Sequence, residues 1–206
     1  KEYRQFIIVL FMLLSLFLFS FHASAANYYV SSDGDDNLSG TSPEQAWKTI
    51  SKVNSYTFKN GDDVYFECGG IWQPYQRLFV DWSGTSNNHV VIGSYYQQNS
   101  KTIHDFNGEY PVISGQDKFP NDTNNGLIQS NEQSNIIVKN IKLLKSNGHG
   151  LFFFKCDNAN ADNIFVDASY RSGIIFSKCN SEFGQSYVKN SIVTKFSNML
   201  IKDQDN

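Results

Sequence analysis

The sequence has no excess of positive charge. It contains 17 lysines and arginines against 20 aspartates and glutamates, which gives a formal net charge of −3 with histidine neutral. Proteins that bind nucleic acid usually present a basic face to the phosphate backbone. A mildly acidic chain lacks this electrostatic footprint, so nucleic acid is excluded as the expected partner.

Compact catalytic motifs are also missing. The chain contains no G-x-S-x-G, no H-E-x-x-H, no phosphate-binding P-loop and no paired metal-ligand spacing. The segment Asp33-Gly-Asp-Asp-Asn37 suggests calcium, because hard cations are held by clustered carboxylates. It lacks the length and the terminal glutamate of an EF-hand loop, so we interpret it as a solvated turn. No metal site is assigned, and the sequence leaves any cofactor unknown.

Proline is scarce, with four residues in all, and none follows Pro120. Proline removes a ladder hydrogen bond and is confined to strand edges, strand starts and bulges. Nothing in the second half of the chain therefore forbids central β-strands.

Long apolar runs are limited to the start of the chain. Lys1 and Arg4 precede a 16-residue run from Phe6 to Phe21, broken only by Ser15 and Ser20, and Ala23-Ser24-Ala25 follows. This order is typical of a secretory signal peptide. The alternative is a transmembrane anchor, but the run is shorter than the roughly 20 residues that span a bilayer.

We therefore expect residues 1–25 to be a signal peptide, cleaved between Ala25 and Ala26. The mature protein is expected to be extracellular or on the cell surface, with the periplasm as an alternative compartment. Residues 26–206 contain no second run of comparable length, so no stable membrane insertion is expected after cleavage.

A repeat of about 24 residues occupies the second half of the chain. Gly126-Leu-Ile-Gln, Gly150-Leu-Phe-Phe, Gly173-Ile-Ile-Phe and Asn198-Met-Leu-Ile follow one another at intervals of 24, 23 and 25 residues. Two further apolar segments lie between these: the second aligns segments that begin at Asn135, Asn163 and Ser186, and the third aligns those that begin at Ile141 and Ile192. Each segment is short, rich in β-branched or aromatic residues, and bounded by Asn, Ser, Asp or Gly, which predicts a strand.

Three short strands in each period, with no helical stretch between them, predict an all-β right-handed parallel β-helix, a solenoid. Stacked coils pair every strand and build a continuous core. Asparagine suits the corners because it tolerates the left-handed backbone conformation and hydrogen-bonds locally. A leucine-rich repeat lacks support because the L-x-x-L-x-L pattern is absent, whereas a β-sandwich stays as the alternative fold.

An N-terminal capping α-helix is predicted at residues 42–54. Ser42-Pro-Glu-Gln45 has the form of a capping box with proline at the first helical position, and Ala46, Ile50 and Val53 form one apolar face. A helix there would cover the open end of the first coil. We assign residues 26–59 to an N-terminal strand and cap helix and residues 60–206 to the coils, with strands expected at Asp63–Glu67, Leu78–Val80, Val90–Ile92 and Val112–Ile113.

The N-terminal segments resemble the cap and first coils of bacterial right-handed β-helix proteins of the pectate-lyase-like superfamily. The resemblance covers nearly all of residues 27–206 and is carried by Tyr28-Tyr-Val-Ser-Ser-Asp-Gly, Ser39-Gly-Thr-Ser-Pro43, Ala46-Trp-Lys-Thr-Ile50, Asn60-Gly-Asp-Asp-Val-Tyr-Phe66, Gly69-Gly-Ile-Trp72, Ser83-Gly-Thr-Ser-Asn-Asn88 and Pro111-Val-Ile-Ser-Gly115. It implies the fold and not the activity, since that superfamily includes lyases, hydrolases, epimerases and adhesins.

The candidate substrate-binding residues are Lys155, Arg171, Lys178 and His149, while no catalytic residue is identified. A lyase acting on a uronate polysaccharide neutralises a carboxylate and removes a proton, which suits such side chains. Lys155 and Lys178 lie five residues after Gly150 and Gly173, so they are expected to stack in adjacent coils. The alternative is that they are ordinary surface side chains.

Glycosidase chemistry would require two facing carboxylates. Asp157 and Asp167 are the acidic side chains near the candidate cations, and their spacing does not demonstrate such a pair. Aromatic side chains in the early loops are candidates for stacking on sugars, with core or cap packing as the alternative; they are Trp72, Tyr75, Trp82, Tyr95 and Tyr96.

Two of the three cysteines fall on the repeat. Cys156 lies six residues after Gly150 and Cys179 six after Gly173, so they are predicted to meet in successive coils about 4.8 Å apart. A disulfide and a stack of two free thiols are both compatible with that distance. Cys68 is left over and is expected in the first coil.

The chain is expected to continue beyond Asn206, because Ile201 begins another coil and a polar capping segment does not follow. Uncovered strand edges around Ile192–Ile201 lead us to expect self-association of residues 26–206. The predicted function is a secreted carbohydrate-active protein, a polysaccharide lyase or glycoside hydrolase with polysaccharide as its partner. The alternative is a non-catalytic glycan-binding or adhesive β-helix.

Overall fold

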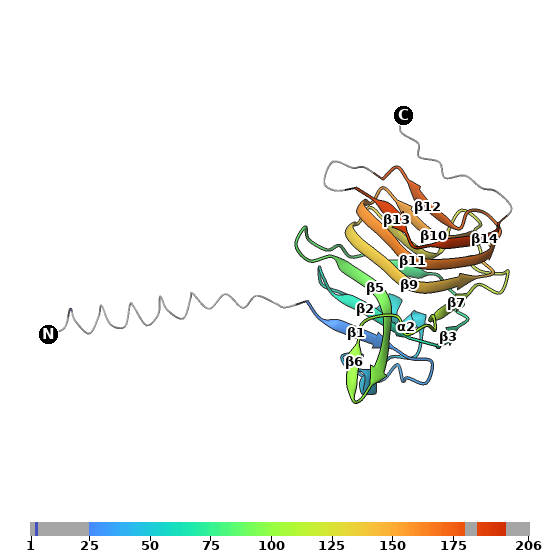
Figure 1. Cartoon of the computed structure of the whole chain (residues 1–206). Helices are drawn as coiled ribbons and strands as arrows, with labels where there is room; N and C mark the ends of the chain where they lie inside the picture. The colour runs from blue at the N-terminus through green and yellow to red at the C-terminus, as the bar shows by residue number, and fades with distance from the viewer. Residues whose placement is uncertain (1–2, 4–24, 180–184, 197–206) are drawn as a thin grey trace.

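The computed structural model describes residue 3, residues 25–179 and residues 185–196, and consists almost entirely of β-strands (Figure 1). The predicted signal peptide and the repeat at Asn198 therefore lie outside the described residues, apart from Tyr3 and Ala25. The elements are β1 (Asn27–Val30), η1 (Pro43–Gln45), α2 (Ile50–Ser55), β2 (Asp63–Glu67), β3 (Ile71–Trp72), β4 (Leu78–Val80), β5 (Val90–Gln98), β6 (Lys101–Ile103), β7 (Val112–Ser114), β8 (Gly126–Asn131), β9 (Ser134–Leu144), β10 (His149–Phe154), β11 (Asp157–Ser169), β12 (Ile174–Ser177), β13 (Tyr187–Lys189) and β14 (Ile192–Phe196).

The strands form two sheets that run along the stack of coils. The larger sheet has the order β1-β2-β5-β9-β11-β13, with β14 beside β11 and with β7 between β3 and β9. The smaller, four-stranded sheet has the order β12-β10-β8-β4. Strands from successive coils pair in parallel, and the exception among the paired strands is the β5–β6 hairpin. The expected all-β parallel β-helix is therefore confirmed, and the two-sheet antiparallel sandwich is not observed.

The coil-to-coil register is 23 residues in the centre of the stack. Leu151 pairs with Ile128 on one side and with Ile174 on the other, and Ser134 pairs with Asp157. The next coil is longer, because Phe165 pairs with Ile192.

The alignment of Gly126 with Gly150 is wrong by one residue, since Gly126 lies opposite His149. Register follows the side chains that point inward, and a slip of one residue would turn them outward. The inward column at this position consists of Leu78, Ile128, Leu151 and Ile174.

In the two central coils, the predicted second and third strands are one long strand that bends at an asparagine, whereas in the next coil they are the separate strands β13 and β14. Asn140 in β9 and Asn163 in β11 have left-handed φ values of 57° and 53°, and Asn163 Nδ2 donates to Asn140 Oδ1 at 2.9 Å. Asn158 likewise stacks on Asn135, with a 2.8 Å bond between their side chains. The alignment of Asn135 with Asn163 is therefore wrong: each belongs to a different corner of the coil.

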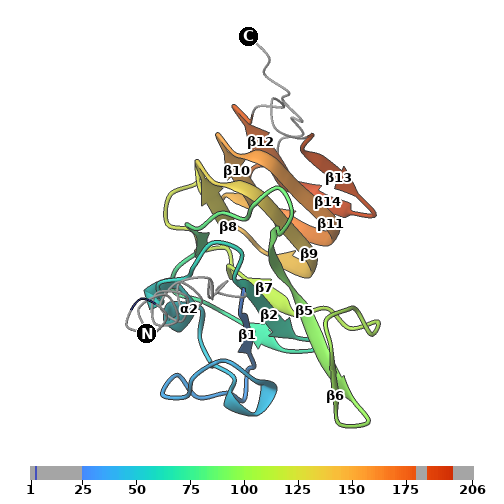
Figure 2. The ribbon, with the colours of Figure 1, turned by 90° about the vertical axis from the view of Figure 1, so that its left-hand side faces the viewer.

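The predicted helix at residues 42–54 is also wrong in extent. The chain forms a short 3₁₀ turn, η1, and then a six-residue helix, α2, because Trp47 between them is extended and bridges to Val30 in β1. Ser42 makes no side-chain capping bond, whereas the Thr49 hydroxyl caps α2 by accepting a bond from Lys52 N. Figure 2 places α2 at the β1 end of the stack, where the prediction expected a cover.

Several columns of apolar side chains fill the interior of the coils and join in one main core cluster. Its members lie at inward positions of successive strands, such as Val90, Ile136 and Ala159, which pair in register and are buried. The strands expected at Asp63–Glu67 and Leu78–Val80 are confirmed without change, and those at Val90 and Val112 are longer than expected. No helix among the described residues is long and apolar enough to cross a membrane.

Candidate functional site

The four-stranded sheet carries aromatic side chains on its outer surface. Alternation along each strand turns Leu151 and Phe153 into the core, so Phe152 and Phe154 face outward. Residues that pair with Phe152 across the sheet form one outward row, which consists of Phe79, Gln129, Phe152 and Ile175. Residues that pair with Phe154 form a second row, which consists of Asn131, Phe154 and Ser177. We call these two rows the aromatic face.

Cationic side chains border this face. Arg77 lies over the ring of Phe79, with 5.5 Å from its guanidinium carbon to the ring centroid. The amino groups of Lys155 and Lys178 lie 5.5 and 5.8 Å from the centroid of the Phe154 ring. Cations held over aromatic rings remain near the surface while covering apolar area. The face therefore combines flat rings with hydrogen-bond donors.

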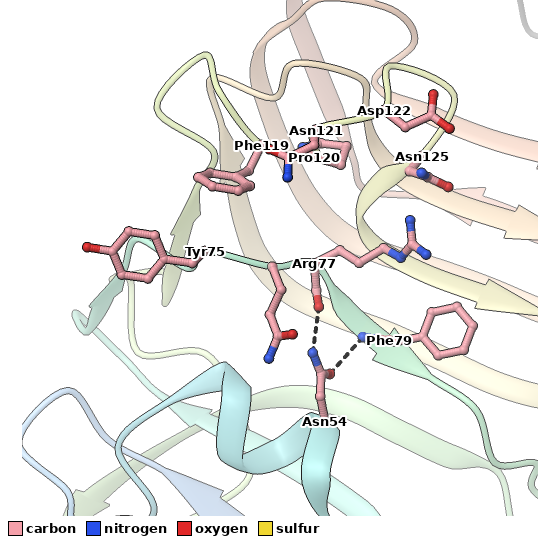
Figure 3. Close-up of a pocket in the computed structure, with 10 residues that line it drawn as sticks. Asn54, Tyr75, Arg77, Phe79, Phe119, Pro120, Asn121, Asp122 and Asn125 are labelled. Atoms are coloured by element: carbon pink, nitrogen blue, oxygen red, sulfur yellow. Dashed lines mark hydrogen bonds between the residues drawn. The ribbon is translucent and has the colours of Figure 1, made fainter.

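An open pocket of about 460 Å³ continues the aromatic face at its β4 end (Figure 3). Phe79 belongs to both. The pocket lies between the segment that leads into β4 and the loop that precedes β8, and it is lined by Asn54, Tyr75, Gln76, Arg77, Phe79, Phe119, Pro120, Asn121, Asp122 and Asn125. Three aromatic rings and Pro120 share this lining with six polar or charged side chains, so the pocket offers a ligand both ring surfaces and hydrogen-bonding groups.

The floor of the pocket is held by hydrogen bonds to Asn54. Its Nδ2 donates to the carbonyl of Arg77 at 2.7 Å, and its Oδ1 accepts from Phe79 N at 3.0 Å (Figure 3). These bonds tie α2 to β4. On the opposite wall, His149 N donates to the carbonyl of Asn125, which fixes the loop to the following coil.

Tyr75 is the most accessible ring of the pocket. It is 87% exposed and meets Phe119 edge-on, at 6.2 Å between ring centroids. Three of the other aromatic candidates, Trp72, Trp82 and Tyr95, are buried. Core packing is thus the structural role of those three residues, and Tyr75 stays a candidate for contact with a sugar.

The four candidate binding residues divide into two groups. Lys155 and Lys178 follow β10 and β12 and stack at one corner, whereas His149 and Arg171 lie at the other end of these strands. Lys155 comes six residues after His149 along β10, which corresponds to about 20 Å between the two groups. The structure brings the members of each group together, but it does not gather all four around one point.

Lys155 and Lys178 occupy a corner that also contains an acidic residue. All three corner residues have left-handed φ values, 56° at Glu132, 51° at Lys155 and 54° at Lys178. Lys155 Nζ lies 2.8 Å from Glu132 Oε1, so one cation is paired within the protein. Glu132 was missed from the sequence, although its position 23 residues before Lys155 would have identified it once the register was known.

His149 is buried and uncharged at neutral pH. Its Nδ1 accepts a hydrogen bond from Ser172 N at 3.3 Å. Burial lowers the pKa of its imidazole to about 4, and the charge of Arg171 acts in the same direction. On this geometry His149 positions the Asn125 loop through its backbone and does not offer a cation to a ligand.

The acidic candidates are separated. Asp157 begins β11, and Asp167 lies near its other end, where it accepts a bond from the Thr194 hydroxyl and pairs with Lys195. They do not form a facing pair.

The acidic turn is held by hydrogen bonds within the protein. Asp36 accepts bonds from Lys48 N, Thr49 N and the Thr49 hydroxyl. No metal-binding cluster of three side chains occurs in the part of the chain that the structure describes.

The outward phenylalanines were not predicted from the sequence. A signal was present, because Leu151-Phe-Phe-Phe154 is an unbroken apolar run at a place where outward positions are ordinarily polar. The pocket had no such signal, since its walls come from segments that are distant in the chain.

Comparisons with known proteins identify relatives of the fold. No family model matches the chain. A lacto-N-biosidase from Bifidobacterium longum subsp. longum is 34% identical over 76 residues, which are 35% of this chain and 5% of that protein. The chain thus spans a small part of the curated relative that it matches.

Two solved structures resemble a larger part of the chain. A GH136 lacto-N-biosidase from Eubacterium ramulus has a TM-score of 0.61 at 18% identity, covering 82% of this chain and 34% of that one. A rhamnogalacturonan lyase has a TM-score of 0.50 at 12% identity, covering 84% of this chain and 51% of that one. The chain therefore has a parallel β-helix fold, which it shares with proteins that have been named for two different carbohydrate activities.

Proposed function

We propose that the chain is part of an exported carbohydrate-active enzyme that binds its glycan along the aromatic face and in the adjoining pocket. The observation that carries this proposal is the continuity of the two through Phe79. The exposed ring of Tyr75 and the partly exposed phenylalanines offer apolar surfaces to the faces of sugar rings, and the neighbouring amides and cations offer hydrogen bonds to hydroxyl groups. Export rests on the signal-like segment at residues 1–25.

Of the two reaction types predicted from the sequence, we propose the glycoside hydrolase over the polysaccharide lyase. The support is the 34% identity to a lacto-N-biosidase and the higher TM-score of the GH136 structure. Since the chain covers 34% of that structure, the activity of the whole protein forms part of the proposal. The extracellular polysaccharide or oligosaccharide substrate is bound by the residues described above.

A non-catalytic glycan-binding protein is the second candidate. The observation that favours it is the placement of carboxylates. Hydrolysis requires two of them on either side of the scissile bond. Among the residues that line the pocket, Asp122 is the single acidic side chain, and Glu132 at the corner is paired with Lys155.

The test incubates the full-length protein with a lacto-N-biose-containing oligosaccharide and, separately, with rhamnogalacturonan. Mass spectrometry of the products separates the mechanisms, because hydrolysis adds water and a lyase leaves an unsaturated uronate. Phe152→Ala and Tyr75→Ala are expected to weaken glycan affinity by about tenfold each, the loss of one aromatic contact. Binding without products would favour the non-catalytic candidate.

Phe165→Ala is the matched control. Phe165 is a partly exposed phenylalanine with a lysine over its ring, Lys142 at 4.7 Å, but it lies on the larger sheet. Its substitution should leave glycan affinity unchanged. Equal losses of glycan affinity in Phe152→Ala and Phe165→Ala would contradict the proposed binding surface. So would unchanged affinity in both Tyr75→Ala and Phe152→Ala.

A further inference from the structure

Cys156 and Cys179 occupy equivalent positions in consecutive coils. They follow β10 and β12, whose residues Phe154 and Ser177 pair in register, and each cysteine comes directly after a corner lysine. Cys156 N donates a hydrogen bond to Cys179 Sγ at 3.4 Å. The two side chains therefore lie one above the other, as the repeat predicts, and both are free thiols in this structure.

The two sulfurs differ in accessibility. Cys156 is fully buried in the core, with its Sγ 3.4 Å from the carbonyl oxygens of Ser130 and Phe154. Cys179 is partly exposed, and its Sγ lies 3.6 Å from the carbonyl of Phe153. One member of the pair is thus reachable from solvent and the other is held behind it.

We propose that Cys156 and Cys179 are a redox pair that closes into a disulfide between consecutive coils when the protein meets an oxidising disulfide. Neighbouring strands of a stack lie about 4.8 Å apart, inside the 4.4–6.8 Å range of Cα separations that a disulfide accepts. The cross-link would join the coil that contains β10 to the coil that contains β12. The inference rests on this geometry and does not depend on the proposed function.

The oxidant is a disulfide, supplied by a small molecule or by a thiol–disulfide oxidoreductase. The Cys179 thiolate attacks one sulfur of the oxidant, which forms a mixed disulfide and expels one thiolate. The Cys156 thiolate then attacks Cys179 Sγ, forms the Cys156–Cys179 bond and expels the second thiolate. Two electrons pass to the oxidant, and the two protons lost by the cysteines go to the two expelled thiolates.

The ionisation of the pair favours this exchange. Hydrogen bonding with Cys179 lowers the pKa of the Cys156 thiol to about 7 against the effect of its burial, and the same contact raises the pKa of Cys179. Coupled thiols titrate as a unit. Near neutral pH the negative charge therefore favours Cys156, and Cys179 becomes the attacking thiolate when its proton passes to Cys156 through their contact, so a nucleophile is available without a basic solution.

The cross-link has a direct consequence for the corner of the aromatic face. Lys155 and Lys178 immediately precede the two cysteines in the chain. A bond between the sulfurs therefore fixes the distance between the backbones of the two lysines. It also anchors Cys179, which follows β12, to the coil before it. In the reduced pair this connection depends on the hydrogen bonds of the sulfurs and on packing such as the stacked rings of Phe153 and Phe176.

The test equilibrates the protein in glutathione buffers of increasing oxidised fraction, followed by alkylation of free thiols and non-reducing peptide mapping. The expected result is one intramolecular cross-linked peptide, Cys156–Cys179, with Cys68 alkylated throughout. Oxidation should raise the midpoint of thermal unfolding by about 5 to 10 °C, as expected for closure of a loop of this size. Persistence of both free thiols in the most oxidising buffer would overturn the inference.

Cys68→Ser is the matched control, because Cys68 is a partly buried thiol whose Sγ lies beside Asp105 O, away from the pair. This variant should retain both the cross-link and the thermal shift. Cys179→Ser removes the more exposed partner and should lose both. A cross-link that includes Cys68, or a thermal shift that survives in Cys179→Ser, would also overturn the inference.

Discussion

His149 shows how a polar side chain is accommodated at a single position of the stack. It is 6% exposed, its Nδ1 accepts from Ser172 N, and its carbonyl accepts a 2.6 Å bond from the Ser146 hydroxyl. The pKa of about 4 lies below the ordinary value of 6.5, so the unfolded chain takes up a proton at a pH where the folded chain does not. The neutral ring is therefore part of what stabilises the folded state.

A change of pH should reveal this contribution. The stabilisation is present above pH 6.5 and is lost as the pH falls from there to about 4. The free energy of unfolding decreases by up to about 3 kcal/mol over this range. His149→Asn supplies an amide oxygen for Ser172 N and removes the titration. Chemical unfolding at several pH values is expected to show a steeper acid loss in the wild type than in the variant. Parallel curves for the two proteins would refute this assignment.

The helix α2 depends on a side chain from the acidic turn before it. Asp36 Oδ1 accepts from Lys48 N at 2.8 Å and Thr49 N at 2.9 Å, and its Oδ2 accepts from the Thr49 hydroxyl at 2.6 Å. Burial alone would raise the pKa of Asp36, but the bonds from Thr49 and Lys48 outweigh it and lower the pKa. Thr49 in turn caps α2, so the turn and the helix form one structural unit.

Asp36→Asn should destabilise this unit. The amide retains one acceptor oxygen and loses the charge that strengthens all three bonds, at an expected cost of about 1 to 2 kcal/mol in the free energy of unfolding. Asp33→Asn in the same turn is the control, because Asp33 donates its backbone N–H to Ser31 Oγ and the substitution leaves that bond in place. Denaturant titration of both variants measures the difference. A loss in Asp33→Asn as large as in Asp36→Asn would contradict the role of Asp36.

At the scale of the whole molecule, stability depends on contacts between neighbouring coils. Ile136 is fully buried and pairs with Val90 in the preceding coil and with Ala159 in the following one. Ile137, the next residue of β9, points to the opposite side of the sheet and is partly exposed. In a solenoid each coil touches only its neighbours, so a defect in one coil weakens the two beside it.

Ile136→Ala should therefore cost about 2 to 5 kcal/mol, the range for a large core side chain reduced to alanine. Hydrogen exchange of the backbone amides should accelerate in β5, β9 and β11 together, because all three strands border the cavity that the substitution leaves at Ile136. Ile137→Ala, with the same change of side chain on the outer side, should cost about 1 kcal/mol or less. Faster exchange confined to β9 would argue against coupling between coils.

Local sequence patterns predicted much of the fold. Apolar alternation identified β2 and β4 with their observed bounds, and the spacing of Cys156 and Cys179 predicted their contact. These features depend on the two-residue period of a strand and on a constant coil length, both of which are visible along the chain. The helix at 42–54 failed because the bridge between Trp47 and Val30 competes with the helical propensity of the segment.

The candidate site depended on tertiary structure. Tyr75 and Phe119 are separated by more than 40 residues and meet because the coil brings the loops before β4 and β8 to one side of the stack. The path of a loop is decided by contacts with neighbouring coils and leaves no periodic signal. The sequence by itself thus determined that the chain coils and which side chains point inward. Only the tertiary structure decided which outward side chains share a surface, because that depends on the register between coils and on the routes of the loops.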